Sequence, residues 1–140
     1  MWFHSSALAV AGSLSLTFAL ILAWGLVGVR TSAVMKRWVP NYQYLLKSHI
    51  DFLMMTGLLF VFFVLFAHFR LTPPAFIVAA MCAGSLGNPL GFLALAIKPD
   101  LPQRPDSVFG AVMTLSFTST TIGYSGAAWL VAHAALLGAR

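Results

Sequence analysis

His49 and Asp51 are the two residues of this chain whose types and positions best suit chemistry. They lie two residues apart at the start of an almost purely apolar stretch, residues 50–67, in a chain of which only 8% is charged. An ionisable side chain inside hydrocarbon costs about 3 kcal/mol, so it is usually kept for a proton, a metal ion or a polar ligand. The pair is therefore the first candidate site.

A neutral histidine is a common ligand for transition metals, and one axial histidine is enough to hold haem because the porphyrin supplies the other nitrogens. A zinc site needs three or four protein ligands, and no His, Cys, Asp or Glu lies three or four residues from His49. We therefore expect His49 to be a ligand of haem iron. The alternative is an interfacial histidine beside Lys47 that only reaches out to water.

Asp51 cannot share an ion with His49 on a regular helix, because residues two apart point about 200° from each other. The two side chains would serve different faces of the helix or different subunits.

The segments that must position these residues are apolar and long. The chain has 140 residues, of which 60% are hydrophobic, and its mean hydropathy is +0.91. Spans of about 20 residues cross a bilayer as helices, which satisfy their own backbone hydrogen bonds. We expect one all-α domain over residues 1–140, an integral membrane four-helix bundle with spans at residues 7–29, 50–67, 75–97 and 107–137.

The connections between these spans carry most of the charge. Basic residues concentrate in two of the connections. The first contains Arg30, Lys36, Arg37 and Lys47, and the third contains Lys98 and Arg104. By the positive-inside rule this bias predicts both termini outside, and we expect a bacterial inner membrane. The net charge of +5 suits anionic lipid headgroups and requires no nucleic acid. Trp38, Tyr42 and Tyr44 around Pro40 are typical of an interfacial segment.

Small residues in the spans predict close helix contacts. Gly87 and Gly91 form a G-x-x-x-G pair in the third span, and Ser13 and Thr17 form a similar pair in the first. In the third span, Asn88 and Pro89 predict a polar kink that faces the interior of the bundle.

Hydroxyl side chains recur in the last span with helical spacing. Thr114, Thr118, Thr121 and Ser125 are separated by four, three and four residues, and Tyr124 flanks them. This spacing places them on one helix face. That face either packs against another helix or forms the wall of a binding site.

One known family shares this layout. The chain has Lys47-Ser48-His49 at the mouth of the second span, then Met54, Met55 and Gly57, and later Asn88 before Gly91-Phe92 and a proline-containing link. In these features it resembles the styrene oxide isomerases, small four-helix membrane enzymes. The resemblance implies a homo-oligomer, a trimer, that binds haem b between subunits through His49. It also implies a hydrophobic epoxide as substrate, which ferric iron opens as a Lewis acid to give a carbonyl product.

Two residues of that family are replaced here. The family has an asparagine about two turns after its histidine, where this chain has Met55 or Thr56, and a tyrosine where this chain has Phe92 or Leu93. His49 carries over as the haem ligand and Asn88 as a pocket residue. Other polar groups would then make the missing contacts with the substrate, and the candidates are Tyr124, Thr121 and Asp51.

Two other classes of function remain open. A small proton-coupled multidrug-type transporter also has four helices, but it needs a carboxylate at its centre, and residues 7–29 contain none while Asp51 lies near the end of its span. A non-catalytic subunit of a larger membrane complex is the third possibility. The chain has no G-x-G-x-x-G, P-loop, G-x-S-x-G or H-E-x-x-H motif, which argues against common soluble enzyme classes.

Overall fold

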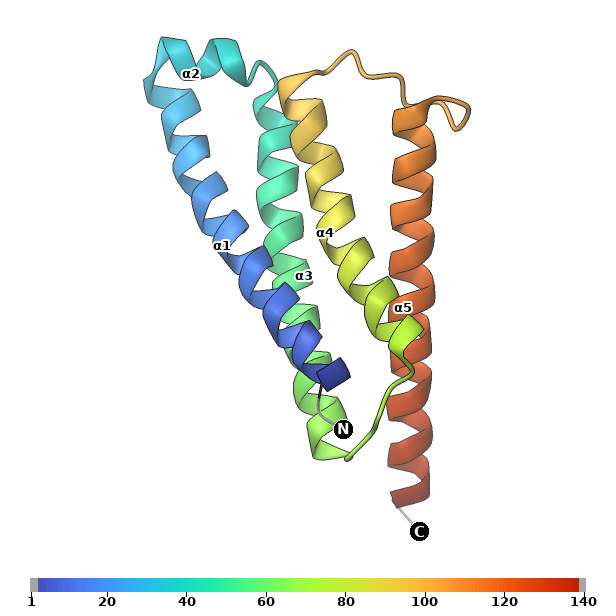
Figure 1. Cartoon of the computed structure of the whole chain (residues 1–140). Helices are drawn as coiled ribbons and strands as arrows, with labels where there is room; N and C mark the ends of the chain where they lie inside the picture. Colours follow the sequence, from blue (N-terminus) through green and yellow to red (C-terminus); the bar gives the residue numbers. More distant parts are fainter. Residues whose placement is uncertain (1–2, 139–140) are drawn as a thin grey trace.

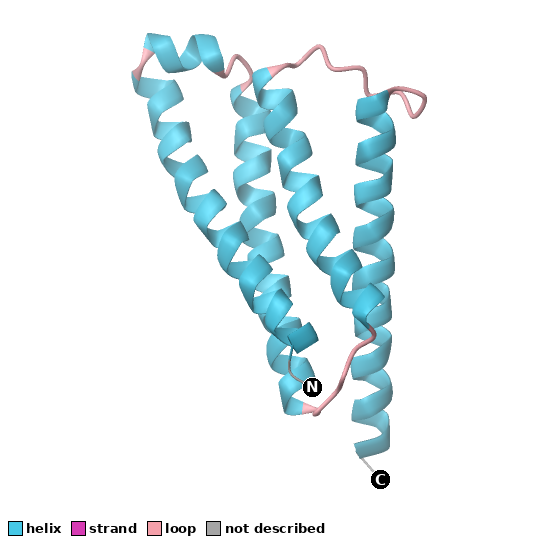
Figure 2. Cartoon of the chain, in the orientation of Figure 1, coloured by secondary structure: helices cyan, strands magenta, loops and turns pink. Residues whose placement is uncertain are grey.

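A computed structural model describes residues 3–138 and shows helices joined by short connections (Figures 1 and 2). The described residues contain no strand, so the all-α prediction is confirmed. The helices are α1 (Phe3–Thr31), α2 (Ala33–Trp38), α3 (Tyr42–His68), α4 (Ala75–Ile97) and α5 (Val108–Gly138).

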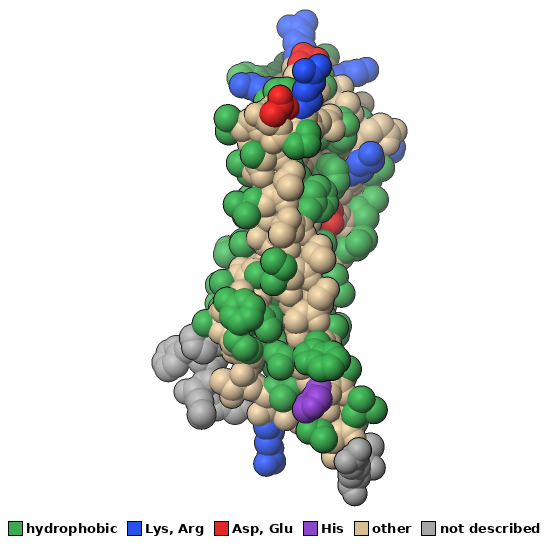
Figure 3. Space-filling view, turned by 90° about the vertical axis from the view of Figure 1, so that its right-hand side faces the viewer, with side chains coloured by type: hydrophobic (Ala, Val, Ile, Leu, Met, Phe, Trp, Pro, Cys, Tyr) green, Lys and Arg blue, Asp and Glu red, His purple; other side chains and the backbone are tan. Residues whose placement is uncertain are grey.

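Three of these helices, α1, α3 and α4, are long and apolar enough to cross a membrane. The fourth long helix, α5, has 31 residues. Serine, threonine and glycine recur in its sequence, and it is not apolar enough to be counted with the other three. Most charged side chains gather at the end that carries α2, and apolar side chains cover much of the length below it (Figure 3). The structure therefore supports a membrane protein in which three of the described helices are long and apolar enough to span the bilayer.

The start of α3 differs from the sequence prediction. The helix begins at Tyr42 rather than at residue 50, because the side chain of Asn41 caps it and accepts a hydrogen bond from the backbone N–H of Tyr44 at 3.2 Å. His49 consequently lies about two turns inside the helix and not at its entrance. The bounds of α4 agree with residues 75–97, and those of α5 differ from residues 107–137 by one residue.

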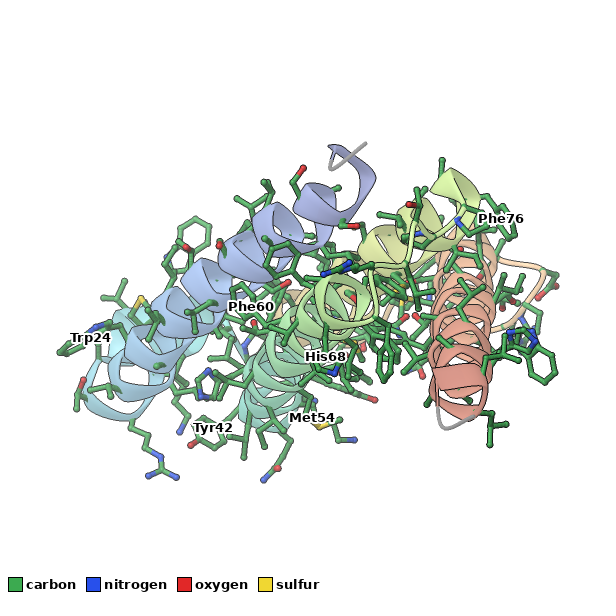
Figure 4. All side chains as sticks on the ribbon, turned by 90° about the horizontal axis from the view of Figure 1, so that it is seen from below. Trp24, Tyr42, Met54, Phe60, His68 and Phe76 are labelled. Carbon is green, nitrogen blue, oxygen red and sulfur yellow. The ribbon has the colours of Figure 1, made fainter. Side chains whose placement is uncertain are left out.

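The long helices form an open row in the order α1, α3, α4, α5 (Figures 1 and 4). Helix α3 packs between α1 and α4, and α5 packs mainly on α4. The N-terminal half of α1 leans towards α4, where the Cys82 sulfur lies 3.8 Å from the Ala7 carbonyl oxygen. The short helix α2 connects α1 to α3 at one end of the long helices (Figure 1).

Glycine residues bring α4 and α5 close together. Gly84 faces Thr120, and a Cβ at Gly84 would lie 2.6 Å from the Thr120 backbone nitrogen. On the other side of the contact, a Cβ at Gly123 would lie 2.5 Å from the backbone nitrogen of Met81. Gly87 faces Ser116 in the same contact, which we call the α4–α5 seam. The seam therefore tolerates only hydrogen at these positions.

The second predicted pair, Ser13 and Thr17, does not lie between helices of this chain. Both side chains are exposed, and the Thr17 hydroxyl donates to the Ser13 carbonyl at 2.9 Å. Helix α1 packs instead through its other face, where Leu8, Ser15 and Ala19 are fully buried.

Gly84→Ala tests the seam. The added methyl would meet the backbone of Thr120, and overpacking of this kind lowers the free energy of unfolding by about 1 to 3 kcal/mol. Unfolding in mixed detergent micelles, followed by circular dichroism, measures the change. Gly57→Ala is the matched control, because nothing lies within 4 Å of its added Cβ. Equal stability of the two variants would contradict the close approach.

Candidate functional site

His49 lies on α3 with its ring against α1. Its Nδ1 is 2.9 Å from the backbone carbonyl oxygen of Ala19, and the side chain is half-buried. A carbonyl oxygen can only accept a hydrogen bond, so Nδ1 must carry the proton. In the neutral ring the lone pair is then on Nε2. Ligand histidines in metal sites are commonly oriented in this way, by a backbone carbonyl or a carboxylate on the other nitrogen.

The packing of α1 on α3 fixes this hydrogen bond. Ala19 is fully buried, and the ring of Phe18 stacks on that of Phe52 with centroids 5.4 Å apart. About three turns beyond His49 along α3 the helices remain close, because a Cβ at Gly12 would lie 3.3 Å from the ring of Phe60. Small residues on α1 thus let the two helices approach, and the carbonyl of Ala19 comes within reach of the histidine.

The described residues contain no group of three or more His, Cys, Asp or Glu that could hold a metal ion. A closed zinc site of protein ligands is therefore absent from residues 3–138. A porphyrin supplies four nitrogens itself and needs only one axial imidazole, which is what His49 offers. One imidazole is the donor that a haem would need, whereas a bare metal ion would need a cluster of ligands that the described residues do not contain.

Asp51 points to another side of α3. It is half-buried, and it lies close enough to Tyr124 of α5 for the two groups to interact electrostatically. The angle of about 200° between residues two apart on a helix accounts for the separation from His49, which faces α1. One protomer therefore does not bring the imidazole and the carboxylate together.

Both ends of the Asn88 side-chain amide are hydrogen-bonded. Its Oδ1 accepts a hydrogen bond from the Ser116 hydroxyl at 2.6 Å, and its Nδ2 donates to the Thr120 hydroxyl at 2.9 Å. The side chain is only 3% exposed, so leaving it unpaired would be costly. In this structure Asn88 joins α4 to α5.

Tyr124 takes part in the same seam. Its hydroxyl lies 2.7 Å from that of Ser85, and its ring packs against Phe62 of α3 with centroids 5.6 Å apart. On the other side of α4, the buried Ser48 of α3 donates to the carbonyl oxygen of Pro89 at 2.7 Å. The predicted polar kink of α4 is thus bonded to a neighbouring helix on each side.

The predicted hydroxyl stripe of α5 does not form this seam. Thr114, Thr118, Thr121 and Ser125 are all exposed. The hydroxyl of Thr118 donates to the Thr114 carbonyl at 2.8 Å, and that of Thr121 donates to the Phe117 carbonyl at 2.9 Å. A threonine that bonds its own helix needs no partner helix. Spacing alone missed Ser116 and Thr120, and their position opposite the glycines of α4 was the signal that could have found them.

No family model, no curated protein and no solved structure among those compared with the chain matches it.

A double-mutant cycle tests the role of Asn88 in the seam. Asn88→Ala and Ser116→Ala share one hydrogen bond, so their effects on the free energy of unfolding should couple by about 0.5 to 1.5 kcal/mol. Asn88→Ala combined with Thr118→Ala is the control and should be additive, because Thr118 bonds only its own helix. Additivity in both cycles would contradict the proposed contact.

Proposed function

We propose that this protein is a membrane-embedded isomerase of hydrophobic epoxides that holds haem b through His49. The observation that carries the proposal is the hydrogen bond from His49 Nδ1 to the Ala19 carbonyl, which would leave the lone pair of Nε2 to hold the iron of a haem within an apolar segment. The sequence resemblance to the styrene oxide isomerases supports the same reading. It rests on Lys47-Ser48-His49 and on Asn88 before Gly91-Phe92.

When bound, haem supplies a ferric Lewis acid that polarises the epoxide oxygen, so that the ring opens to a carbonyl isomer without net oxidation. The chain would anchor the haem and orient its histidine ligand. The carbonyl of Ala19 orients the imidazole through its hydrogen bond to Nδ1. In the proposed site, apolar residues of the segment would exclude water, which would otherwise add to the opened epoxide and give a diol.

A second subunit would complete this site. His49 faces α1, whereas the remaining candidates for contact with the substrate, Asn88, Tyr124 and Asp51, lie on the side of α4 and α5. In a homo-oligomer, with a trimer as the resemblance implies, that side of one protomer would face His49 of the next. Of the three candidates, Tyr124 and Asp51 suit the contact best, because both ends of the Asn88 amide are already bonded.

The membrane arrangement that goes with this function has four spans. Helix α5 packs along α4, and its 31 residues extend for about 46 Å, which exceeds the hydrocarbon thickness. Helix α1 begins and helix α5 ends on the side opposite α2 (Figure 1). The concentration of basic residues near α2 then favours termini outside, in a bacterial inner membrane. The substrate reaches the protein through the lipid bilayer.

His49→Ala tests the haem ligand. The purified wild type should show a Soret band that shifts on reduction with dithionite, and His49→Ala should lose it because no other axial donor replaces Nε2. His133→Ala is the control and should keep the band, since its ring lies beside Trp129 in α5 with centroids 6.2 Å apart. Circular dichroism confirms that both variants are helical.

The same samples test the reaction. Wild-type proteoliposomes should convert styrene oxide to phenylacetaldehyde, as followed by gas chromatography, and the loss of activity should parallel the loss of haem. Equal bands in the two variants, or a colourless but folded wild type, would refute the assignment.

Asp51 supports a second candidate, the small proton-coupled multidrug-type transporter, because its carboxylate is half-buried in a membrane-spanning helix. For a transporter, Asp51→Asn should abolish proton-driven export of ethidium from vesicles. For the isomerase, wild-type vesicles should show no such export, and Asp51→Asn should retain the Soret band. Export that depends on Asp51 in a haem-free protein would decide for the transporter.

A further inference from the structure

A cavity lies between α4, the start of α5 and the link that joins them. Its volume is about 210 Å³, and aromatic and aliphatic side chains form most of its wall. The lining residues on which the argument depends are Phe92, Gln103, Phe109, Met113, Thr114 and Phe117. The link between α4 and α5, which contributes Gln103 to the lining, lies at the same end of the long helices as α2 (Figure 1), where membrane and water meet in the proposed arrangement.

The roof of the cavity is held rigidly. The hydroxyl of Ser107 shares its proton between the carbonyl oxygens of Pro102 and Arg104, at 2.6 and 2.7 Å. The same oxygen accepts the backbone N–H of Gly110 at 3.0 Å and so caps α5. Gly110 is in direct contact with the Arg104 carbonyl, so a side chain there would push the link away. The link that carries Gln103 is therefore fixed over the cavity.

The walls are also fixed in advance. The ring of Phe92 stacks on that of Tyr44, with centroids 6.4 Å apart and planes 16° from parallel. The ammonium group of Lys47 lies 5.2 Å from the centre of the Tyr44 ring on α3. Met113 packs directly against Gly91, which has no side chain to displace it. A ligand would therefore meet a preformed surface, which lowers the entropy cost of binding.

The size and lining of the cavity define what it can hold. The cavity is partly open to its surroundings, and its volume of about 210 Å³ exceeds the roughly 150 Å³ of a closed apolar cavity that accommodates benzene, so it has room for an aromatic ring with a short substituent. Three phenylalanine rings and a methionine sulfur favour an aromatic guest. The Thr114 hydroxyl already donates to the Gly110 carbonyl, so the amide of Gln103 is the donor available in the lining.

We propose that this cavity is a binding site for a small, uncharged aromatic molecule that carries one hydrogen-bond acceptor, such as an ether, epoxide or carbonyl oxygen. The ring lies between Phe92 and Phe117, and the acceptor points towards Gln103. The site does not depend on haem or on His49, because His49 faces α1 while the cavity lies between α4 and α5.

Photolabelling of the full chain in lipid nanodiscs tests the site. The probe is 3-phenyl-3-(trifluoromethyl)diazirine, with anisole as the competitor and mass spectrometry to locate the labels. We expect saturable labelling of Met113 and Phe117 that excess anisole reduces at least fivefold. Val112 and Leu115, which are exposed on the same helix, should carry labelling that anisole does not displace.

Two matched variants distinguish a filled cavity from a misfolded protein. Thr114→Phe would place a ring in the cavity and should abolish the anisole-sensitive labelling. Thr118→Phe, one turn along α5, should leave it intact, because Thr118 is as exposed as Thr114 and makes the same kind of hydrogen bond to its own helix, but does not line the cavity. Labelling at Val112 in both variants reports that the helix is still present.

Three outcomes would overturn the proposal. Labelling of the lining residues that anisole does not displace would mean that lipid chains occupy the space. Equal anisole-sensitive labelling in Thr114→Phe and Thr118→Phe would place the bound probe elsewhere. Equal displacement by toluene, which lacks an acceptor, would remove the role of Gln103.

Discussion

The approach of α4 to α5 at Gly84 is the contact on which much of the structure depends. Without side chains at Gly84 and Gly87, the two backbones come close enough for the short side chains of Asn88, Ser116 and Thr120 to bond across the seam. A larger residue at Gly84 would separate the helices and leave a buried amide without partners. The dispersion contacts of the seam and its hydrogen bonds therefore depend on each other, and both hold α5 to the row.

The sequence predicts the helices well where their chemistry is uniform. Residues 75–97 form a helix with the predicted bounds, because two prolines precede it and a charged, proline-rich link follows it. The sequence places the start of α3 too late. An apolar run marks only the part of a helix that lies within the membrane, and the helix can begin before that part. The polar first turns after Asn41 are helical because a cap and neighbouring helices stabilise them. The sequence also predicts a membrane span over α5. This helix is long enough to cross a bilayer, but it is not among the helices that are apolar enough by composition.

The candidate site was only partly readable from sequence. Helical geometry alone separated His49 from Asp51, and the structure shows them on different sides of α3. The carbonyl of Ala19 could not be anticipated, because a backbone acceptor leaves no mark on residue type. The hydroxyl stripe of α5 was misleading for a related reason. A threonine can donate to the carbonyl four residues earlier, so regular spacing of hydroxyls does not identify the face that packs.

The open row also has a consequence for how the chain enters a membrane during synthesis. Neighbours in the row are neighbours along the sequence, so each long helix emerges from the ribosome after the helix on which it packs. Helix α4 is the exception in one respect. Its Pro89 carbonyl can accept a hydrogen bond from Ser48 of α3, which is made earlier. Asn88 can bond to Ser116 and Thr120 only after α5 has been made. The buried amide of Asn88 is thus satisfied only when α5 is in place, and this dependence gives insertion a defined last step.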